Sequence, residues 1–285
     1  MTEVATSDQL LVVIDPVARQ TDGEAVRIAK DVLSAGATTK VCLPEGPEEF
    51  ARALARRGSR RPVVVGDDRA LVRAVSLLHR QRELAGCVLS VVPVGTALSV
   101  ARSLGVPTGT VAAARAVLYG AERRLDLLVD DSDGVVLGAL HIPPVPVFQV
   151  PQEPVDDPAH PWLRTYQSLV RTLVPSRPPR TPSPVTAPRT GPSRLRVEVD
   201  GVTLIDLDQP VEAVSVTPGG AGFAAVEVHP ASVGAEVAPL LARGRLVTVS
   251  GTDFRYRADA TVAGPVRRRT WTVREEGLSL TLPVR

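Results

Sequence analysis

Hydrophobic and polar residues alternate in two different patterns along this chain. Up to about residue 130, short apolar runs alternate with longer segments in which apolar residues recur every three or four positions. The short runs predict strands at 9–15, 39–44, 62–67 and 87–93, and the longer segments predict helices at 24–36, 47–58 and 70–81. This alternation is typical of βαβ units, so we expect an α/β domain with a mostly parallel sheet covered by helices.

The second pattern begins at residue 194, where short segments alternate between apolar and polar positions and turn residues separate them. These segments predict strands at 195–201, 202–207, 212–218, 224–230, 245–251, 254–262, 270–275 and 278–284. Such alternation places apolar side chains on one face of each strand, as in an antiparallel sheet with one packed face and one wet face. We therefore predict a C-terminal antiparallel β-sandwich.

Proline dominates the stretch between these two halves. Residues 141–161 and 174–193 contain seven prolines each, which excludes a regular helix or a central strand there. One short helix is predicted near Trp162–Leu173. The composition of 174–193 predicts a linker or disordered insertion, and this is a simpler interpretation than a PxxP ligand for a partner groove.

Composition and charge exclude several classes of protein. The 285 residues are enough for one large domain or two smaller ones, and the formal net charge is only +2, which gives no reason to expect a nucleic-acid partner. No uninterrupted apolar stretch of about 18 residues predicts a transmembrane helix, and no basic region precedes the first apolar run. We therefore expect a cytoplasmic protein.

Cysteine and histidine offer no metal-binding pattern. Cys42 and Cys87 lie in apolar, strand-like runs and are predicted to be core residues. The four histidines have no companions at the spacing of zinc ligands. Two further short motifs favour plain turns: Asp130–Gly134 lacks the remaining ligands of a calcium loop, and Gly220–Ala225 leads into a strand where a dinucleotide site needs a helix.

Two strand-to-helix loops are candidates for binding phosphate. In an open α/β sheet, ligands bind beyond the carboxyl ends of the strands, where loops and helix N-termini present backbone N–H groups to anions. The loops in question are 66–71 and 93–98, and each has a glycine near the end of a predicted strand. Either loop alone is a weak signal, because a single glycine at such a turn is usual turn chemistry.

Taken together, the loops resemble the lipid kinase superfamily of bacterial diacylglycerol kinases and sphingosine kinases, and more distantly NAD kinases. In that family a Gly-Gly-Asp-Gly-Thr loop ends one strand, and a Pro-x-Gly-Thr-Gly-Asn-Asp segment with an Ala-Arg-x-Leu-Gly helix follows the next. The positions that match this second segment are Pro93, Gly95, Thr96, Ala101, Arg102, Leu104, Gly105 and Pro107. Gly120 with Arg124-Leu125-Asp126 also resembles a family motif, and residues 250–284 resemble the end of actinobacterial members.

The resemblance implies a nucleotide-binding domain over residues 1–130 and a β-sandwich lipid-kinase domain over residues 131–285. It implies phosphorylation of a lipid hydroxyl by ATP with Mg²⁺. It also implies a lipid or membrane surface as partner, with the protein peripheral at the membrane. ATP would lie over Gly66, Asp68, Arg69, Gly95 and Thr96. Asp68 and Asp259 would hold the metal, and Asp259 would stand in the catalytic acidic turn. The arginine pairs and triplet along the chain are explained more simply as solvated faces than as lipid contacts.

The first loop departs from the family pattern where the chemistry takes place. It reads Gly66-Asp67-Asp68-Arg69-Ala70, so Asp67 and Arg69 replace glycines and Ala70 replaces threonine. The Asp67 carboxylate would repel a triphosphate, whereas the Arg69 guanidinium could grip one.

The other motifs depart in the same direction. Ala97, Leu98 and Ser99 stand where the family has Gly-Asn-Asp, and Asp259-Ala260-Thr261 lacks the glutamate of the family's Asp-Gly-Glu turn. Near the start, Asp15-Pro16 keeps only the proline of an Asn-Pro-x-Ser-Gly loop. No residue clearly supplies a general base. Two hypotheses therefore stand: an impaired lipid kinase, or an inactive pseudokinase that binds a lipid, a nucleotide or a protein.

Overall fold

The computed structural model describes residues 9–144, 191–232 and 237–284. The helix predicted near Trp162–Leu173 and most of the predicted linker at 174–193 lie outside the described residues. Ser193, at the end of that predicted linker, already belongs to a strand.

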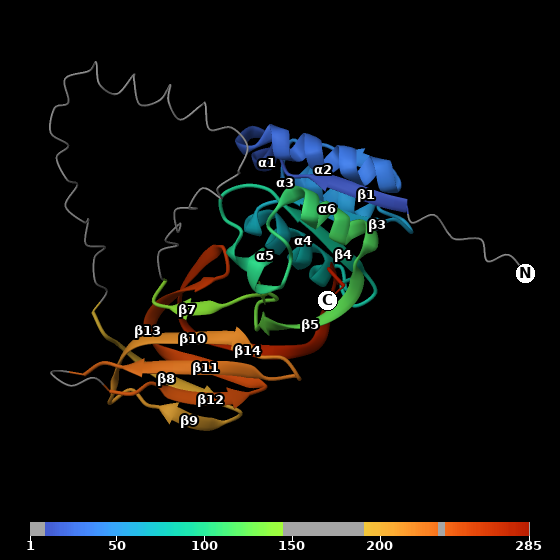
Figure 1. Ribbon diagram of the computed structural model, residues 1–285. Coiled ribbons are helices and arrows are strands. Elements are labelled where there is room, and N and C mark those ends of the chain that lie inside the picture. The colour runs from blue at the N-terminus through green and yellow to red at the C-terminus, as the bar shows by residue number, and fades with distance from the viewer. Residues whose placement is uncertain (1–8, 145–190, 233–236, 285) are drawn as a thin grey trace, which may run out of the picture. The chain divides into compact units, whose positions relative to one another are not determined.

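The N-terminal half alternates strands and helices, as the sequence predicts (Figure 1). Its strands are β1 (Gln9–Ile14), β2 (Thr38–Cys42), β3 (Arg61–Gly66), β4 (Val88–Pro93) and β5 (Ala121–Asp130). Its helices are α1 (Pro16–Thr21), α2 (Gly23–Gly36), α3 (Pro47–Ala55), α4 (Asp68–Arg80), α5 (Ser99–Ser103) and α6 (Thr110–Tyr119).

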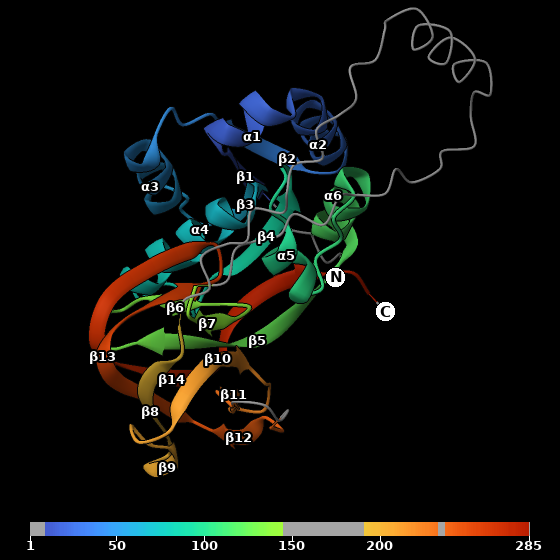
Figure 2. The ribbon, with the colours of Figure 1, turned by 90° about the vertical axis from the view of Figure 1, so that its left-hand side faces the viewer.

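Four of these strands form a parallel sheet in the order β2-β1-β3-β4. Strands β1, β3 and β4 are buried at almost every position, because helices cover both faces of the sheet. Figure 2 shows α2 and α6 on one side of the strands and α3 and α4 on the other. The predicted mostly parallel α/β architecture is confirmed.

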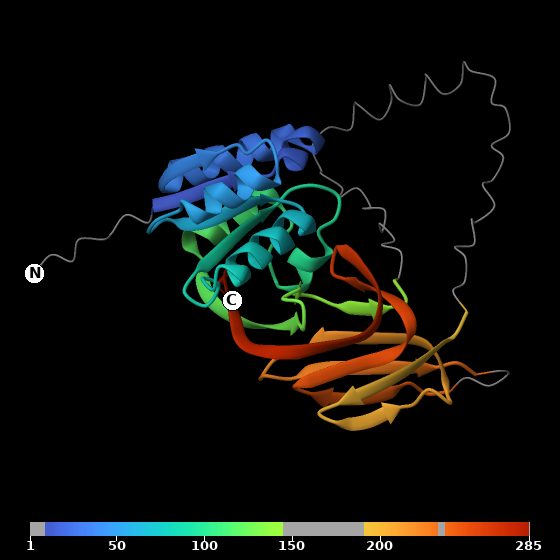
Figure 3. The same cartoon turned by 180° about the vertical axis from the view of Figure 1, so that it is seen from behind.

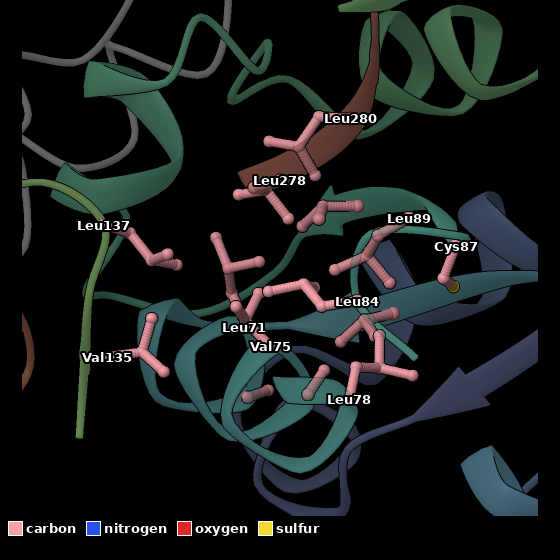
Figure 4. Packing of buried hydrophobic residues seen from close by; sticks show 14 of the residues in the cluster. Leu71, Val75, Leu78, Leu84, Cys87, Leu89, Val135, Leu137, Leu278 and Leu280 are labelled. Carbon is pink, nitrogen blue, oxygen red and sulfur yellow. The ribbon is translucent and has the colours of Figure 1, made fainter. Parts of the chain in front are cut away.

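Each face of the sheet has its own apolar core. One core joins α2 and α6 to the sheet, and it contains Leu33 and Val117. The other joins α3, α4 and α5 to the opposite face (Figure 4). In that core Leu71, Val75 and Leu78 lie one turn apart on α4, so a single stripe of the helix meets the sheet. Cys87 is buried there as predicted, whereas Cys42 is only half-buried.

The C-terminal half consists of β strands that are mostly antiparallel, as predicted. They are β6 (Val135–Val136), β7 (Leu140–Ile142), β8 (Ser193–Val199), β9 (Val202–Ile205), β10 (Pro210–Pro218), β11 (Ala224–Pro230), β12 (Leu240–Gly244), β13 (Leu246–Ala258) and β14 (Thr261–Leu282). Their inward side chains form a third core around Trp271, whose ring meets that of Tyr256 edge-on at 5.3 Å between centroids. The predicted turn at Gly220–Ala225 is confirmed, since it joins β10 to β11.

The last strands differ from the prediction. The segment 270–275 and most of 278–284 lie in one 22-residue strand, β14. The segment 254–262 contains the end of β13, a turn and the first residues of β14. The red ribbon of β14 runs from its hairpin with β13 to the α/β half (Figure 3). There it pairs in parallel with β4, at Ser279–Val88, and antiparallel with β5. Strands of both halves therefore share one sheet, and the domain boundary at residue 130 stays a prediction.

The predicted turn at Asp130–Gly134 is held by one carboxylate. Asp130 Oδ1 accepts hydrogen bonds from Ser132 N at 2.8 Å, Ser132 Oγ at 2.7 Å and Gly134 N at 2.8 Å. Burial alone would raise the pKa of Asp130, but these bonds and the positive charge on Arg269 hold the pKa below its ordinary value.

The lowered pKa predicts a pH-dependent contribution of Asp130 to stability. A carboxyl whose pKa is lower in the folded state stabilises fully above its unfolded pKa of about 3.9, and this contribution is lost as pH falls through the folded pKa. We expect Asp130→Asn to lower the free energy of unfolding by about 1 to 3 kcal/mol at pH 7 and by less at pH 3. Chemical denaturation at both pH values measures this difference.

The matched control is Asp133→Asn in the same turn. Asp133 is exposed and has a φ of 61°, which asparagine also tolerates. This variant is expected to unfold like the wild type at both pH values. A loss for Asp130→Asn that does not change with pH would show that the carboxylate charge is irrelevant to the turn.

Candidate functional site

The two candidate loops lie side by side at the carboxyl ends of β3 and β4. Val94 N donates a hydrogen bond to Gly66 O at 3.0 Å, and Asp68 N donates one to Ala97 O at 2.9 Å. A Cβ atom on Gly66 would lie 2.7 Å from Ala70 Cβ, so only glycine fits at this crossing. Gly95 has a φ of 129°, a conformation that strongly favours glycine. The structure therefore places Gly66 and Gly95 in adjacent loops, as the resemblance implies.

Asp67 closes the N-terminus of α4. Its Oδ1 accepts hydrogen bonds from Arg69 N at 3.0 Å and Ala70 N at 3.1 Å. A Cβ on Gly95 would lie 3.2 Å from Asp67 Cβ, so this side chain also lies against the second loop. Free N–H groups at a helix start are what an anion binds, and here a carboxylate of the chain already occupies two of them.

Asp68 points into the protein and joins α4 to α5. Its side chain is buried, Oδ2 accepts from Ser99 Oγ at 3.0 Å and Val100 N at 2.9 Å, and Oδ1 accepts from Ala101 N at 3.0 Å. Both carboxylate oxygens therefore bind the first turn of α5. The N-terminus of this second helix is also satisfied from within the chain.

A third carboxylate lies at the end of β1. Asp15 is buried, caps α1 by accepting a hydrogen bond from Val17 N at 2.9 Å, and forms an ion pair with Arg73 Nη1 at 2.8 Å. The Arg73 guanidinium also lies over the Phe50 ring, 5.7 Å from its centroid. Asp15 and Arg73 thus connect the ends of β1 and α4 beside the two loops.

Asp259 lies in the turn between β13 and β14 and holds the chain between β6 and β7. Its oxygens accept hydrogen bonds from Leu137 N at 2.7 Å, Gly138 N at 2.7 Å and Ala139 N at 3.0 Å. Burial raises the pKa of Asp259, and the negative charge of nearby Asp68 acts in the same direction, against the opposing effect of the three N–H donors.

These carboxylates do not form a metal site in the described part of the chain. No group of three or more His, Cys, Asp or Glu side chains is placed there to hold an ion. Both oxygens of Asp68 and of Asp259 accept hydrogen bonds from the protein itself, mostly from backbone N–H groups. Mg²⁺ prefers oxygen ligands that are free to complete an octahedron, so these two residues do not fit it in this arrangement.

The comparison with known families finds a match in the N-terminal segment. Residues 9–129 match the family model described as the diacylglycerol kinase catalytic domain. The match covers less than half of the chain. In the matched segment, the loops at Gly66 and Gly95 are the ones whose sequence resembles the family motifs, and Arg69 and Thr96 are exposed beside them. A search of curated proteins found no match to the chain.

Solved structures support the same fold for the whole chain. A crystal structure of a proposed diacylglycerol kinase from Bacillus anthracis str. Sterne superposes with a TM-score of 0.68 at 13% identity, over 97% of this chain and 98% of that one. Another diacylglycerol kinase structure from the same organism gives 0.66 at 12% identity, over 97% of each chain. At such identities the likeness shows the fold alone.

The sequence pointed to the carboxylates of these loops as candidates but did not indicate the hydrogen-bond partner of each. The signal for Asp67 and Asp15 was present, because aspartate just before a helix is a preferred N-cap. No signal in the sequence pairs Asp68 with α5 or Asp15 with Arg73, since 31 and 58 residues separate the partners. Among the described residues, no helix is long and apolar enough to cross a bilayer.

Proposed function

We propose that this chain is a non-catalytic member of the diacylglycerol kinase fold, which acts by binding a lipid or a protein and not by phosphoryl transfer. The observation that carries the proposal is the Asp67 carboxylate, which accepts the N–H groups of Arg69 and Ala70 at the start of α4. In the family motif this position is a glycine, which leaves the helix start open to phosphate. Here the chain supplies its own anion in place of the ligand.

The cost to a bound triphosphate is large enough to matter. Two unit charges about 4 Å apart repel by roughly 1 kcal/mol in water and by roughly 4 kcal/mol at an effective dielectric constant of about 20. Since about 1.4 kcal/mol is a factor of ten in affinity, Asp67 would weaken binding by roughly five-fold to a thousand-fold. Arg69 is exposed beside the loop, and its single positive charge only partly offsets Asp67 together with the adjacent Asp68.

The second loop and the late turn support the same conclusion. Leu98 is buried where the family has a polar residue, so its side chain packs inward and offers no contact to a nucleotide. Phosphoryl transfer depends on positioning and on neutralising charge with metal, so several losses at one site act together. Asp68 and Asp259 serve as structural hydrogen-bond acceptors in this interpretation.

A second candidate, an active lipid kinase, is favoured by one observation. Residues 9–129 match a catalytic domain family, and the backbones at Gly66 and Gly95 lie together as such a site requires. In this candidate ATP would lie over both loops and a lipid hydroxyl would be the acceptor. The two candidates differ in turnover.

The experiment incubates the full chain with ATP, Mg²⁺ and a panel of diacylglycerol, sphingoid and polyprenyl alcohols. We expect no phosphorylated lipid, while an active bacterial diacylglycerol kinase labels its lipid under the same conditions. We also expect millimolar ATP with Mg²⁺ to give no thermal stabilisation. A ligand that binds the folded chain would stabilise it by about 2.7 kcal/mol at 100 times its Kd. Efficient turnover with any acceptor would overturn the proposal and establish the lipid kinase.

A further inference from the structure

A concave site lies on the side of the α/β sheet formed by β2 and α3. Among the described strands β2 pairs only with β1, so it forms an edge of the sheet. The register pairs Leu11 with Lys40 and Val13 with Cys42, which places Lys40 and Cys42 on the same face as Leu11. Helix α3 packs on this face beside β1, and a cavity of about 430 Å³ remains between α3 and β2.

The cavity has an apolar floor and a charged rim. The buried and half-buried lining residues are apolar and form the floor: Leu11, Cys42, Pro44 and Ala53. The exposed lining residues form the rim: Leu43 and the charged residues Lys40, Glu49, Arg52 and Arg56. Three cations thus surround one carboxylate.

The single carboxylate is already engaged, and two of the cations are not. Glu49 accepts a hydrogen bond from Glu45 N at 2.9 Å and lies 3.6 Å from Arg52. In the part of the chain that the structure describes, neither Lys40 nor Arg56 has a carboxylate within ion-pair distance. The rim therefore presents unneutralised positive charge above an apolar surface.

From this arrangement we propose that the β2–α3 cavity binds a small amphiphilic anion, a carboxylate or phosphate monoester carrying one aromatic or branched aliphatic group. Guanidinium groups match both anions through paired N–H donors, and an ammonium group adds a point charge. The apolar floor takes the body of the ligand. The volume lies near the lower end of the range of roughly 300 to 1,000 Å³ for small-molecule sites. None of the lining residues belongs to the loops at Gly66 and Gly95, so this site does not depend on the proposed function.

The first test measures binding of phenyl phosphate, phenylacetate, inorganic phosphate and neutral benzyl alcohol to the full chain by titration calorimetry. We expect at least one of the two amphiphilic anions to bind ten-fold or more tightly than both inorganic phosphate and benzyl alcohol. The two amphiphilic probes distinguish a phosphate ester from a carboxylate ligand. Equal binding of benzyl alcohol, or no binding of either amphiphilic anion, would overturn the proposal.

Matched variants separate a built site from general surface charge. Lys40→Ala with Arg56→Ala removes two cations from the rim, and Lys30→Ala with Arg115→Ala removes the same two residue types from exposed positions on α2 and α6. We expect the first pair to weaken binding at least ten-fold and the second pair to change it by less than two-fold. Similar weakening by both pairs would mean that the anion responds only to net charge.

Cys42 provides a readout at the cavity itself. Cys42 lines the cavity and is half-buried, whereas Cys87 is only 5% exposed and serves as an internal reference. We expect the bound anion to slow alkylation of Cys42 by iodoacetamide at least five-fold and to leave Cys87 unchanged, as measured by peptide mass spectrometry. Binding without protection of Cys42 would place the anion elsewhere and overturn the assignment.

Discussion

Replacing Asp68 with alanine is expected to lower the free energy of unfolding by about 3 to 5 kcal/mol, a loss typical of a buried group with several hydrogen bonds. The reason is that three donors on α5, Ser99 Oγ, Val100 N and Ala101 N, lose their acceptor, and the bonds from the two backbone donors are buried. Urea denaturation of the two proteins measures the difference. A residue that served mainly to hold metal in an open cleft would behave differently, because its removal relieves repulsion.

The neighbouring Asp67 is the control for this experiment. It also caps a helix, but it is more exposed than Asp68, so Asp67→Ala is expected to cost only about 1 kcal/mol. If Asp68→Ala were as stable as the wild type, the buried role assigned to this carboxylate would be wrong, and the kinase alternative would gain support.

Restoring the family loop is expected to open the first phosphate site. The triple substitution Asp67→Gly, Arg69→Gly and Ala70→Thr changes the loop to Gly-Gly-Asp-Gly-Thr. It removes the carboxylate from the start of α4 and exposes the N–H groups of residues 69 and 70. Since Asp67 opposes a triphosphate by roughly 1 to 4 kcal/mol, we expect affinity for ATP with Mg²⁺ to rise about ten-fold or more. Titration with a non-hydrolysable ATP analogue measures this gain.

A control variant shows whether the gain is specific to the loop. Asp22 caps α2 by accepting a hydrogen bond from Ala25 N at 2.9 Å, so Asp22→Gly removes the same kind of cap at another helix. This variant is expected to leave ATP binding as weak as in the wild type. If the restored loop binds ATP no better than Asp22→Gly, then Asp67 is not what excludes the nucleotide.

The hydrophobic pattern predicted most of the N-terminal half because its strands are buried on both faces and its helices on one stripe. Parallel strands of this kind form continuous apolar runs, such as Val63–Val65, which stand out from their surroundings. The pattern failed at the start of β14, where Arg267–Arg269 interrupt the alternation while the backbone continues as a strand. The predicted break at 276–277 coincides with a shift in the pairing of β14 with β5, where Glu276 has a φ of 50°. Long exposed strands have no single apolar face, so their sequence does not show where they end.

The candidate site was predictable in its residues but not in their orientation. The sequence placed Gly66, Asp67 and Asp68 at the end of one strand and Gly95 at the end of the next. It also indicated that Asp67 opposes phosphate. Whether Asp68 faces the cleft or the protein depends on where α5 begins in space, and this follows from packing between segments about 30 residues apart. The orientation of the Asp259 carboxylate likewise depends on its hydrogen bonds with residues 120 to 122 positions earlier in the chain.

The long strand β14 also affects how this protein is made. Ser279 and Leu280 pair with Val88 and Leu89 of the parallel sheet, so residues near 280 complete a structure whose other strands leave the ribosome far earlier. Contacts of such high sequence separation slow folding, because a long loop must close before they contribute. During translation the edge of β4 that pairs with β14 stays open, so for a long interval chaperones or a neighbouring nascent chain compete for that edge.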